Sequence, residues 1–127
     1  MPVEHTAQAR EILGPDPILA PEQMVVLETD LGRARDTARK AMAVYLRAPN
    51  YLNNLRRLGF DDADFADGGS NRLVDAIVAC GSVDVARDRV QAQFDAGATH
   101  VCVQVLDEEL LTPPRDGWRA LADALPR

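Results

Sequence analysis

The chain has 127 residues, of which 46% are hydrophobic, and a formal net charge of −6 at pH 7. This length is typical of one domain with a single core, and the acidic balance argues against a general affinity for nucleic acid or anionic membranes. No apolar run approaches the roughly 18 residues that a membrane-spanning helix needs. The first residues also lack the basic start and apolar core of a signal peptide. We therefore expect a cytoplasmic protein with neither a nucleic acid nor a membrane as its partner.

The first part of the chain predicts a helix, a connector and a strand. Pro2 and the spaced apolar residues after it indicate a helix that ends at Gly14 and Pro15. Three prolines then make residues 15–22 an extended connector, unsuited to a helix or to a central strand. The apolar run in residues 23–28 predicts a buried parallel strand.

The middle of the chain predicts helices. Asp30 is a good N-cap for the longest helix, residues 31–48, which Pro49 ends. Three segments follow, predicted as a short helix, an acidic loop that ends in glycine and a third helix, over residues 50–59, 60–69 and 71–80. Ser70 can cap the last of these helices.

The strongest strand candidate comes late in the chain. Ser82 can cap a helix over residues 82–96, Gly97 makes a tight turn, and residues 100–106 form a β-branched, almost wholly apolar run. A further helix is predicted over residues 115–125. Helix, turn, buried strand and helix form the repeating unit of a parallel α/β protein. We therefore predict an α/β fold, mostly helical, with two short parallel strands.

Two strands cannot form a sheet that covers so many helices. Parallel strands also need partners on both sides to satisfy their backbone edges. The sequence therefore predicts a part of a larger α/β protein.

The cysteines and histidines offer no metal site. Cys80 and Cys102 are the only cysteines, and both are expected to be reduced residues of the core rather than a bridge. His5 and His100 have no Cys or His neighbour at ligand spacing, so we expect no metal.

Polar residues at the ends of the two predicted strands are the first candidates for chemistry. In a parallel α/β unit, ligands meet residues at or beyond the carboxyl ends of strands. Glu28 closes the first strand, Thr29 follows it, and Gln104 interrupts the second. A polar side chain in an apolar strand needs a partner or a cavity, so a hydrogen-bonded structural role remains the alternative. For Asp30 and the acidic residues 107–109, helix capping and a solvated loop are the favoured interpretations.

A second candidate segment begins with Asn50 and Tyr51 and combines an aromatic ring, amides and paired arginines. Arginines can clamp a phosphate or a carboxylate. Arg56 and Arg57 are adjacent on a predicted helix, however, and so point in different directions. A solvated helix face is the favoured interpretation.

Several phrases, in this order along the chain, resemble the C-terminal part of the bacterial luciferase-like flavin or deazaflavin oxidoreductases. The branch that they resemble most is that of probable coenzyme F420-dependent oxidoreductases. The phrases are Glu4-His5-Thr6-Ala7, Arg10-Glu11-Ile12-Leu13-Gly14, Leu19-Ala20-Pro21-Glu22-Gln23, Val26-Leu27-Glu28-Thr29-Asp30, Pro49-Asn50-Tyr51 with Asn53-Asn54-Leu55-Arg56-Arg57-Leu58-Gly59-Phe60, and Asp95-Ala96-Gly97-Ala98 before His100-Val101-Cys102-Val103-Gln104-Val105-Leu106.

The resemblance implies one partial domain over residues 1–127, the C-terminal fragment of a TIM (β/α)8 barrel. Residues 23–28 would be the seventh strand and residues 100–106 the eighth. The chain would supply barrel units six to eight, with a helical insertion at about residues 49–81. The first six strands would be missing.

The resemblance also implies a function. The parent enzymes transfer a hydride between coenzyme F420, or alternatively FMN, and a small organic substrate. Because loops of the missing strands hold most of the cofactor, this chain is expected to be inactive alone and to bind no cofactor by itself. It would supply one wall of the cleft, and no catalytic residue can be carried over. The wall residues would be Glu28, Thr29, Asn50, Tyr51 and Gln104.

The residues leave two other interpretations open. The chain could be a non-catalytic module that forms a homo-oligomer or docks on a separate N-terminal half, since exposed parallel edges favour association. It could also be a truncated gene product whose first codon is an internal start.

Overall fold

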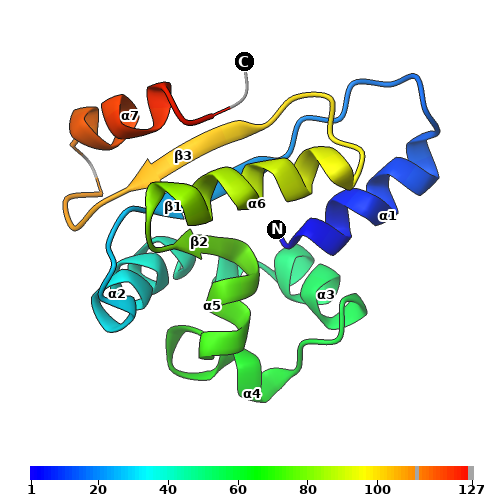
Figure 1. Cartoon of the computed structure of the whole chain (residues 1–127). Helices are drawn as coiled ribbons and strands as arrows, with labels where there is room; N and C mark the ends of the chain where they lie inside the picture. The colour runs from blue at the N-terminus through cyan, green and yellow to red at the C-terminus, as the bar shows by residue number, and fades with distance from the viewer. Residues whose placement is uncertain (111, 126–127) are drawn as a thin grey trace.

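Three parallel strands form one sheet in the computed structural model, which describes residues 1–110 and 112–125. The strands are β1 (Glu22–Val26), β2 (Val78–Cys80) and β3 (Cys102–Leu106), in the spatial order β2-β1-β3 (Figure 1). β1 is the central strand, and it pairs with three residues of β2 and with all five residues of β3. The predicted α/β class and the mostly helical content are confirmed.

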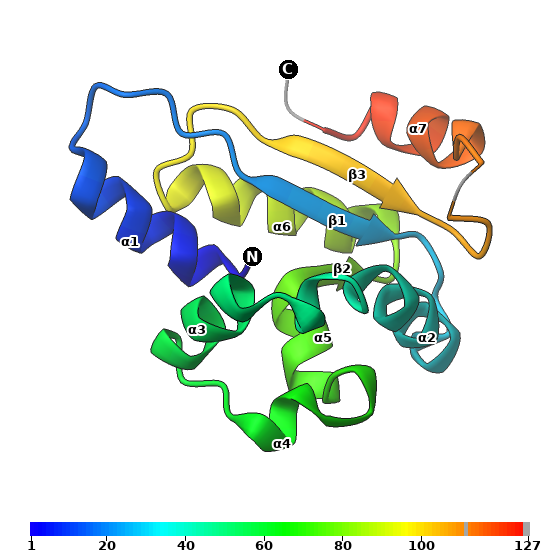
Figure 2. The same cartoon turned by 180° about the vertical axis from the view of Figure 1, so that it is seen from behind.

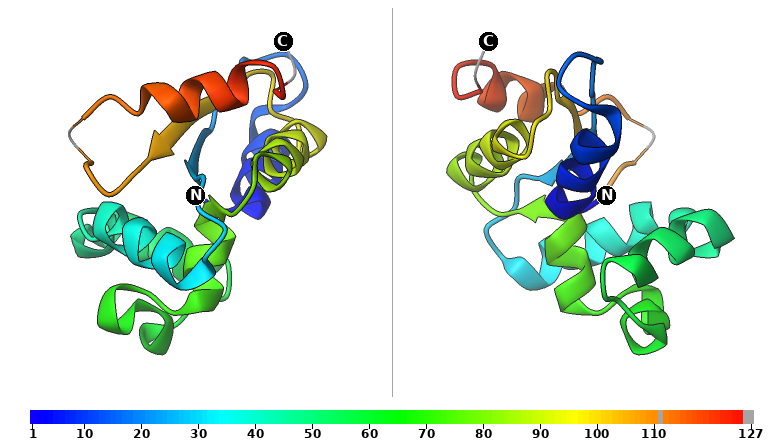
Figure 3. Two further views of the ribbon diagram at one scale, coloured as in Figure 1. Left: turned by 60° about the vertical axis from the view of Figure 1, so that its left-hand side comes forward. Right: turned by 90° about the vertical axis from the view of Figure 1, so that its right-hand side faces the viewer.

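Helices cover both faces of this sheet (Figure 2, Figure 3). Side chains alternate along β1, so Met24 and Val26 pack on one face and Val25 packs on the other. The first face meets α2 (Leu31–Met42), α3 (Pro49–Arg57) and α5 (Asn71–Ile77), and the second meets α6 (Val83–Asp95) and α7 (Arg115–Ala122). The other described α-helices are α1 (Val3–Leu13) and α4 (Asp62–Phe65), and the short 3-10 turns are η1 (Tyr45–Arg47) and η2 (Ala66–Gly68).

A chain of buried polar side chains joins α1 and α6 to β1. The Thr6 hydroxyl donates to Gln93 Oε1 at 2.6 Å, and Gln93 Nε2 donates to Gln23 Oε1 at 2.9 Å. Gln23 Nε2 in turn donates to the carbonyl of Ile77 at 3.1 Å. This series of hydrogen bonds gives partners to three polar side chains that are buried away from water. It also connects elements that lie far apart in the sequence.

β2 was missed by the sequence analysis, which predicted a helix over residues 71–80. α5 ends at Ile77, and Val78 already has extended backbone angles (φ −112°, ψ 130°). The apolar run at residues 77–80 fits a buried helix or a buried strand equally well, and pairing with the free edge of β1 decides for the strand. The expected insertion at residues 49–81 is therefore not wholly helical.

The predicted burial of the last strand was wrong in its first half. β3 lies at the edge of the sheet, and Cys102 and Gln104 are exposed while Val105 and Leu106 are buried. Both cysteines were expected in the core, but only Cys80 is buried. An apolar composition indicates a strand without showing whether other elements cover both faces along its whole length.

The long helix predicted over residues 31–48 ends earlier. α2 stops at Met42, and after it η1 turns the chain toward Pro49, the first residue of α3. The predicted caps are confirmed, because Asp30, Ser70 and Ser82 each accept a hydrogen bond from a backbone N–H in the first turn of their helix. None of the described helices is both long and apolar enough to cross a membrane.

Candidate functional site

A groove lies where β1 and β3 end, beside the start of α7. It encloses about 530 Å³, and its walls come from both strand ends and from the segment that leads into α7. Residues that line it include Val26, Leu27, Leu106, Asp107, Pro114 and Arg115. The carboxyl ends of neighbouring parallel strands are the usual ligand sites of α/β proteins. This groove is therefore the first candidate site.

Glu28 lies at this end of the sheet, where it helps to cap α2. Its Oε1 accepts a hydrogen bond from the backbone N–H of Asp30 at 2.9 Å, and its Oε2 is 3.5 Å from Arg33 Nη2. The same Arg33 nitrogen lies 3.3 Å from Oε1 of Glu108, which follows β3. Arg33 therefore bridges the chain segments beyond the two strands, and Glu28 has a structural partner. Thr29, the next residue, is exposed.

Gln104 does not reach the carboxyl end. It lies in the middle of β3, where it pairs with Met24 of β1, and its side chain is exposed to solvent. With Trp118 and Leu110 it lines a hollow of about 340 Å³. Gln104 was expected to face a partner or a cavity, and its exposed side chain lies beside this hollow rather than in the core.

Asn50 and Tyr51 lie at the opposite end of the sheet. Tyr51, in the first turn of α3, lines a cavity with Glu22, the first residue of β1, and its ring centroid is 4.9 Å from that of Tyr45. Asn50 is exposed. Of the five residues predicted to form one wall, only Glu28 and Thr29 lie together.

The arginines of α3 serve the surface of the fold. Arg56 Nη2 donates to Asp62 Oδ1 at 2.7 Å, and its guanidinium lies over the ring of Phe65. Arg57 Nη1 donates to Asn54 Oδ1 at 3.2 Å. The two side chains have different partners, as expected for adjacent helical residues, so they do not form one clamp.

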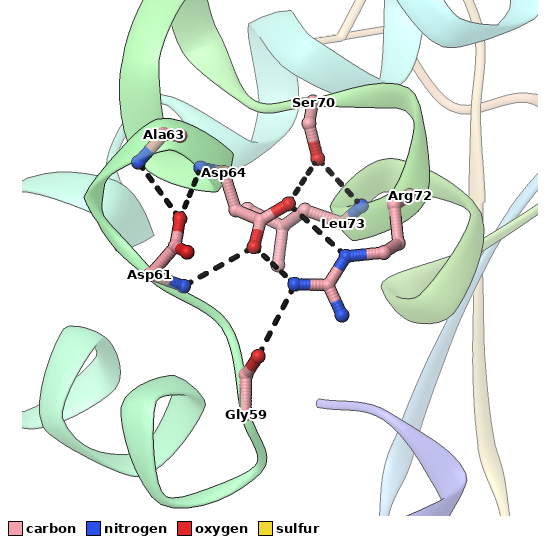
Figure 4. Close-up of polar contacts among 7 residues, drawn as sticks. All are labelled: Gly59, Asp61, Ala63, Asp64, Ser70, Arg72 and Leu73. Carbon is pink, nitrogen blue, oxygen red and sulfur yellow. Dashed lines mark hydrogen bonds and ion pairs between the residues drawn. The ribbon is translucent and has the colours of Figure 1, made fainter.

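The most perturbed carboxylate belongs to Asp64 (Figure 4). It accepts hydrogen bonds from Arg72 Nε at 3.2 Å, the Ser70 hydroxyl at 2.7 Å and the Asp61 backbone N–H at 3.1 Å. The hydrogen bonds from Arg72, followed by that from Ser70, lower the pKa of Asp64 from 3.8 to about 2. Arg72 also stacks on Phe60, with 4.4 Å between the guanidinium and the ring centroid. These partners all lie within residues 60–72, so the cluster fixes this loop.

The Asp64 cluster predicts a loss of stability in acid. A folded-state pKa of about 2, below the ordinary 3.8, means that the carboxylate stabilises the fold fully above the unfolded pKa. This contribution is lost as the pH falls from about 4 to about 2. In urea titrations from pH 6 to pH 2, Asp64→Asn should be less stable than the wild type at pH 6, and the difference should shrink toward pH 2.

The matched control is Asp16→Asn, which changes an exposed carboxylate in the connector. Because this side chain is exposed, the substitution should change the free energy of unfolding little. If the stability difference between Asp64→Asn and the wild type is as large at pH 2 as at pH 6, the carboxylate does not have the assigned role.

A second cavity, at the amino end of the sheet, was not anticipated. It encloses about 260 Å³ between α1, α3, η1 and the start of β1. All three methionines and both tyrosines of the chain line it. These residues are spread along the sequence from Met1 to Tyr51 and form no motif. The only signal in the sequence is that methionine and tyrosine are both rare in this chain and all lie in its first 51 residues.

Metal ligands do not gather in the part of the chain that the structure describes, where no three His, Cys, Asp or Glu side chains are grouped to hold an ion. Comparisons of the chain with protein-family models, with curated proteins and with solved structures find no match.

Proposed function

We propose that the chain is the C-terminal part of a luciferase-like oxidoreductase that uses coenzyme F420 or FMN, and that it supplies one wall of the cleft. The observation that carries the proposal is the series of phrases, in matching order from Glu4 to Leu106, that resembles this family. The cofactor would carry a hydride to or from a small organic substrate, and the protein would orient both molecules.

The pairing of β1 with β3 supports this proposal. In a TIM barrel each parallel strand pairs with the next one, so the seventh and eighth strands are neighbours. β1 and β3 pair in parallel from Glu22↔Cys102 to Val26↔Leu106. The other edge of β1, where a sixth strand would pair, carries the three residues of β2. The proposal therefore requires that β2 leave β1 when the rest of a barrel is present.

The residues of the carboxyl-end groove fit the cofactor only in part. Leu27, Leu106 and Pro114 offer apolar surface for one face of a flat ring system. Arg115 is the only cationic side chain among the described residues of this lining, and Asp107 and Asp116 flank it, so the phosphate of either cofactor would lack a positively charged cradle. We therefore assign no catalytic step to this chain alone.

A titration of the isolated chain with coenzyme F420, and separately with FMN, tests the proposal. Followed by amide NMR, weak binding should shift signals of residues 27–30 and 106–109, around the groove. Tight stoichiometric binding would contradict the incompleteness of the cofactor site. Shifts confined to the amino end of the sheet, or no shifts at millimolar cofactor, would contradict the proposed wall.

A second function, a module that completes its sheet by association, is favoured by one observation. In the described sheet β2 and β3 are the two edge strands, and the longer of them is β3, whose sequence Cys102–Leu106 contains no charge and no proline. Natural edge strands commonly carry such residues because they prevent edge-to-edge pairing. The occupant of this edge would be a second copy of the chain or a separate N-terminal half.

Sedimentation velocity at several concentrations tests this association. Self-pairing through β3 predicts a concentration-dependent dimer, and Gln104→Lys should weaken it because a charge opposes edge pairing. Gln8→Lys adds the same charge at an exposed site on α1 and should have no effect. A monomer at every concentration would exclude the homo-oligomer.

A further inference from the structure

The amino-end cavity lies outside the proposed cleft. Glu22, at the first position of β1, and Ile77, before β2, are among its lining residues, whereas the carboxyl-end groove begins at Val26, the last residue of β1. The cavity and that groove therefore lie toward opposite ends of β1 and share no lining residue. An inference about it stands independently of the oxidoreductase proposal.

The body of the cavity is apolar and adaptable. Met24, Met42, Leu46, Leu55 and Ile77 line it, from β1, α2, η1, α3 and α5. Methionine side chains are flexible and polarisable, fit irregular shapes and make favourable contacts with aromatic rings. The volume of about 260 Å³ exceeds that of a cavity of roughly 150 Å³ that is able to bind benzene. One or two fused rings fit this space.

The rim of the cavity is polar. Tyr45 and Tyr51 present hydroxyl groups, and Glu22 is the only charged side chain in the described lining. Burial, followed by the nearby charge of Glu22, raises the pKa of Tyr45, so its hydroxyl stays protonated at neutral pH. Burial also lowers the pKa of His5 below 6.5, so its imidazole is mainly neutral at pH 7.

These features select a class of ligand. An apolar, methionine-rich body accepts a ring, and the Glu22 carboxylate at the rim can accept a hydrogen bond from a ring N–H or O–H group. The same carboxylate repels an anion. The α-amino group of Met1 also lines the cavity, but burial lowers its pKa from 8.0 and the nearby charge of Glu22 offsets its positive charge, so the cavity offers an anion no net attraction. We propose that the amino-end cavity binds a small uncharged aromatic molecule that carries a hydrogen-bond donor.

Three matched probes test the proposal: indole, N-methylindole and indole-3-acetate. Calorimetry should show saturable binding of indole. N-methylindole, which lacks the donor, should bind roughly twofold to tenfold more weakly because one hydrogen bond is lost. Indole-3-acetate should bind more weakly still, because its negative charge approaches Glu22. Equal affinity for all three probes would contradict the role of the rim.

Methionine methyl NMR locates the bound probe. Met24 and Met42 both line the cavity, so indole should shift the methyl signals of both. Ala9→Trp fills the cavity from α1 and should abolish these shifts, whereas Gln8→Trp places the same ring at the exposed neighbouring position and should leave them unchanged.

If Ala9→Trp fails to fold, Glu22→Gln provides the second test, because it removes the charge from an exposed residue. It should narrow the difference in affinity between indole and indole-3-acetate. Indole binding without shifts at Met24 and Met42, or binding that survives in a folded Ala9→Trp protein, would overturn the proposal.

Discussion

Replacement of Gln93 by leucine is expected to lower the free energy of unfolding by about 2–6 kcal/mol, since each buried group that loses its partner costs roughly 1–3 kcal/mol. Two groups lose a partner. The Thr6 hydroxyl loses its acceptor at 2.6 Å, and Gln23 Oε1 loses its donor at 2.9 Å. Gln23 and Gln93 are both fully buried, so water cannot take the place of the missing amide.

Urea unfolding of Gln93→Leu and Gln91→Leu measures this effect. Gln91 lies on the same helix, but it is exposed and donates a hydrogen bond to Asp95 at the surface. Gln91→Leu should therefore change the free energy of unfolding by no more than about 0.5 kcal/mol. The double variant Thr6→Val/Gln93→Leu adds a test of coupling. Thr6→Val should cost less in the Gln93→Leu background than in the wild type, because the hydroxyl has already lost its acceptor. If the two substitutions lower the free energy of unfolding additively, the hydrogen bond between Thr6 and Gln93 is not the cause of the loss.

The second large effect is expected at Gly117, where Gly117→Ala should destabilise the protein by about 1–3 kcal/mol through overpacking. At an ordinary helix position the same change stabilises, because alanine has the higher helix propensity. Here an added Cβ would lie 2.6 Å from Cγ1 of Val105. Val105 is buried and β-branched, so its side chain cannot turn aside and α7 must move off β3.

The background Val105→Ala separates this clash from other effects. Removal of the Val105 methyl groups opens the space beneath Gly117, so Gly117→Ala should be neutral or stabilising in that background. Thermal unfolding of the two single variants and the double variant completes the cycle. An equal loss from Gly117→Ala in both backgrounds would show that the close approach of α7 to β3 is not the cause.

Elements with a local cause were predictable from the sequence. Asp30, Ser70 and Ser82 each carry a side-chain oxygen that satisfies a free N–H of the following helix, and that bond needs only neighbouring residues. β1 and β3 were recognised because each is a short run of apolar residues between turn signals. The parallel α/β class followed from their alternation with helices.

β2 was missed because its cause is not local. Val78, Ala79 and Cys80 continue an apolar helical pattern, and they become a strand by pairing with Met24, Val25 and Val26, more than fifty residues away. Separation along the sequence also explains why the five predicted wall residues do not lie together. Glu28 and Tyr51 are separated by α2 and η1, which carry the chain from one end of the sheet to the other.

The sequence alone therefore determined most of the helices, three of their caps, two of the three strands and the parallel α/β class, since these depend on residues that are neighbours in the chain. The segment 60–69, expected as a loop, instead holds α4 and η2. Only the tertiary structure decided that β1 is central and β3 exposed, that Glu28 and Tyr51 lie at opposite ends of the sheet, and that all methionines and tyrosines surround one cavity. The physical reason is that strand pairing and packing bring together residues whose separation in sequence carries no local signal.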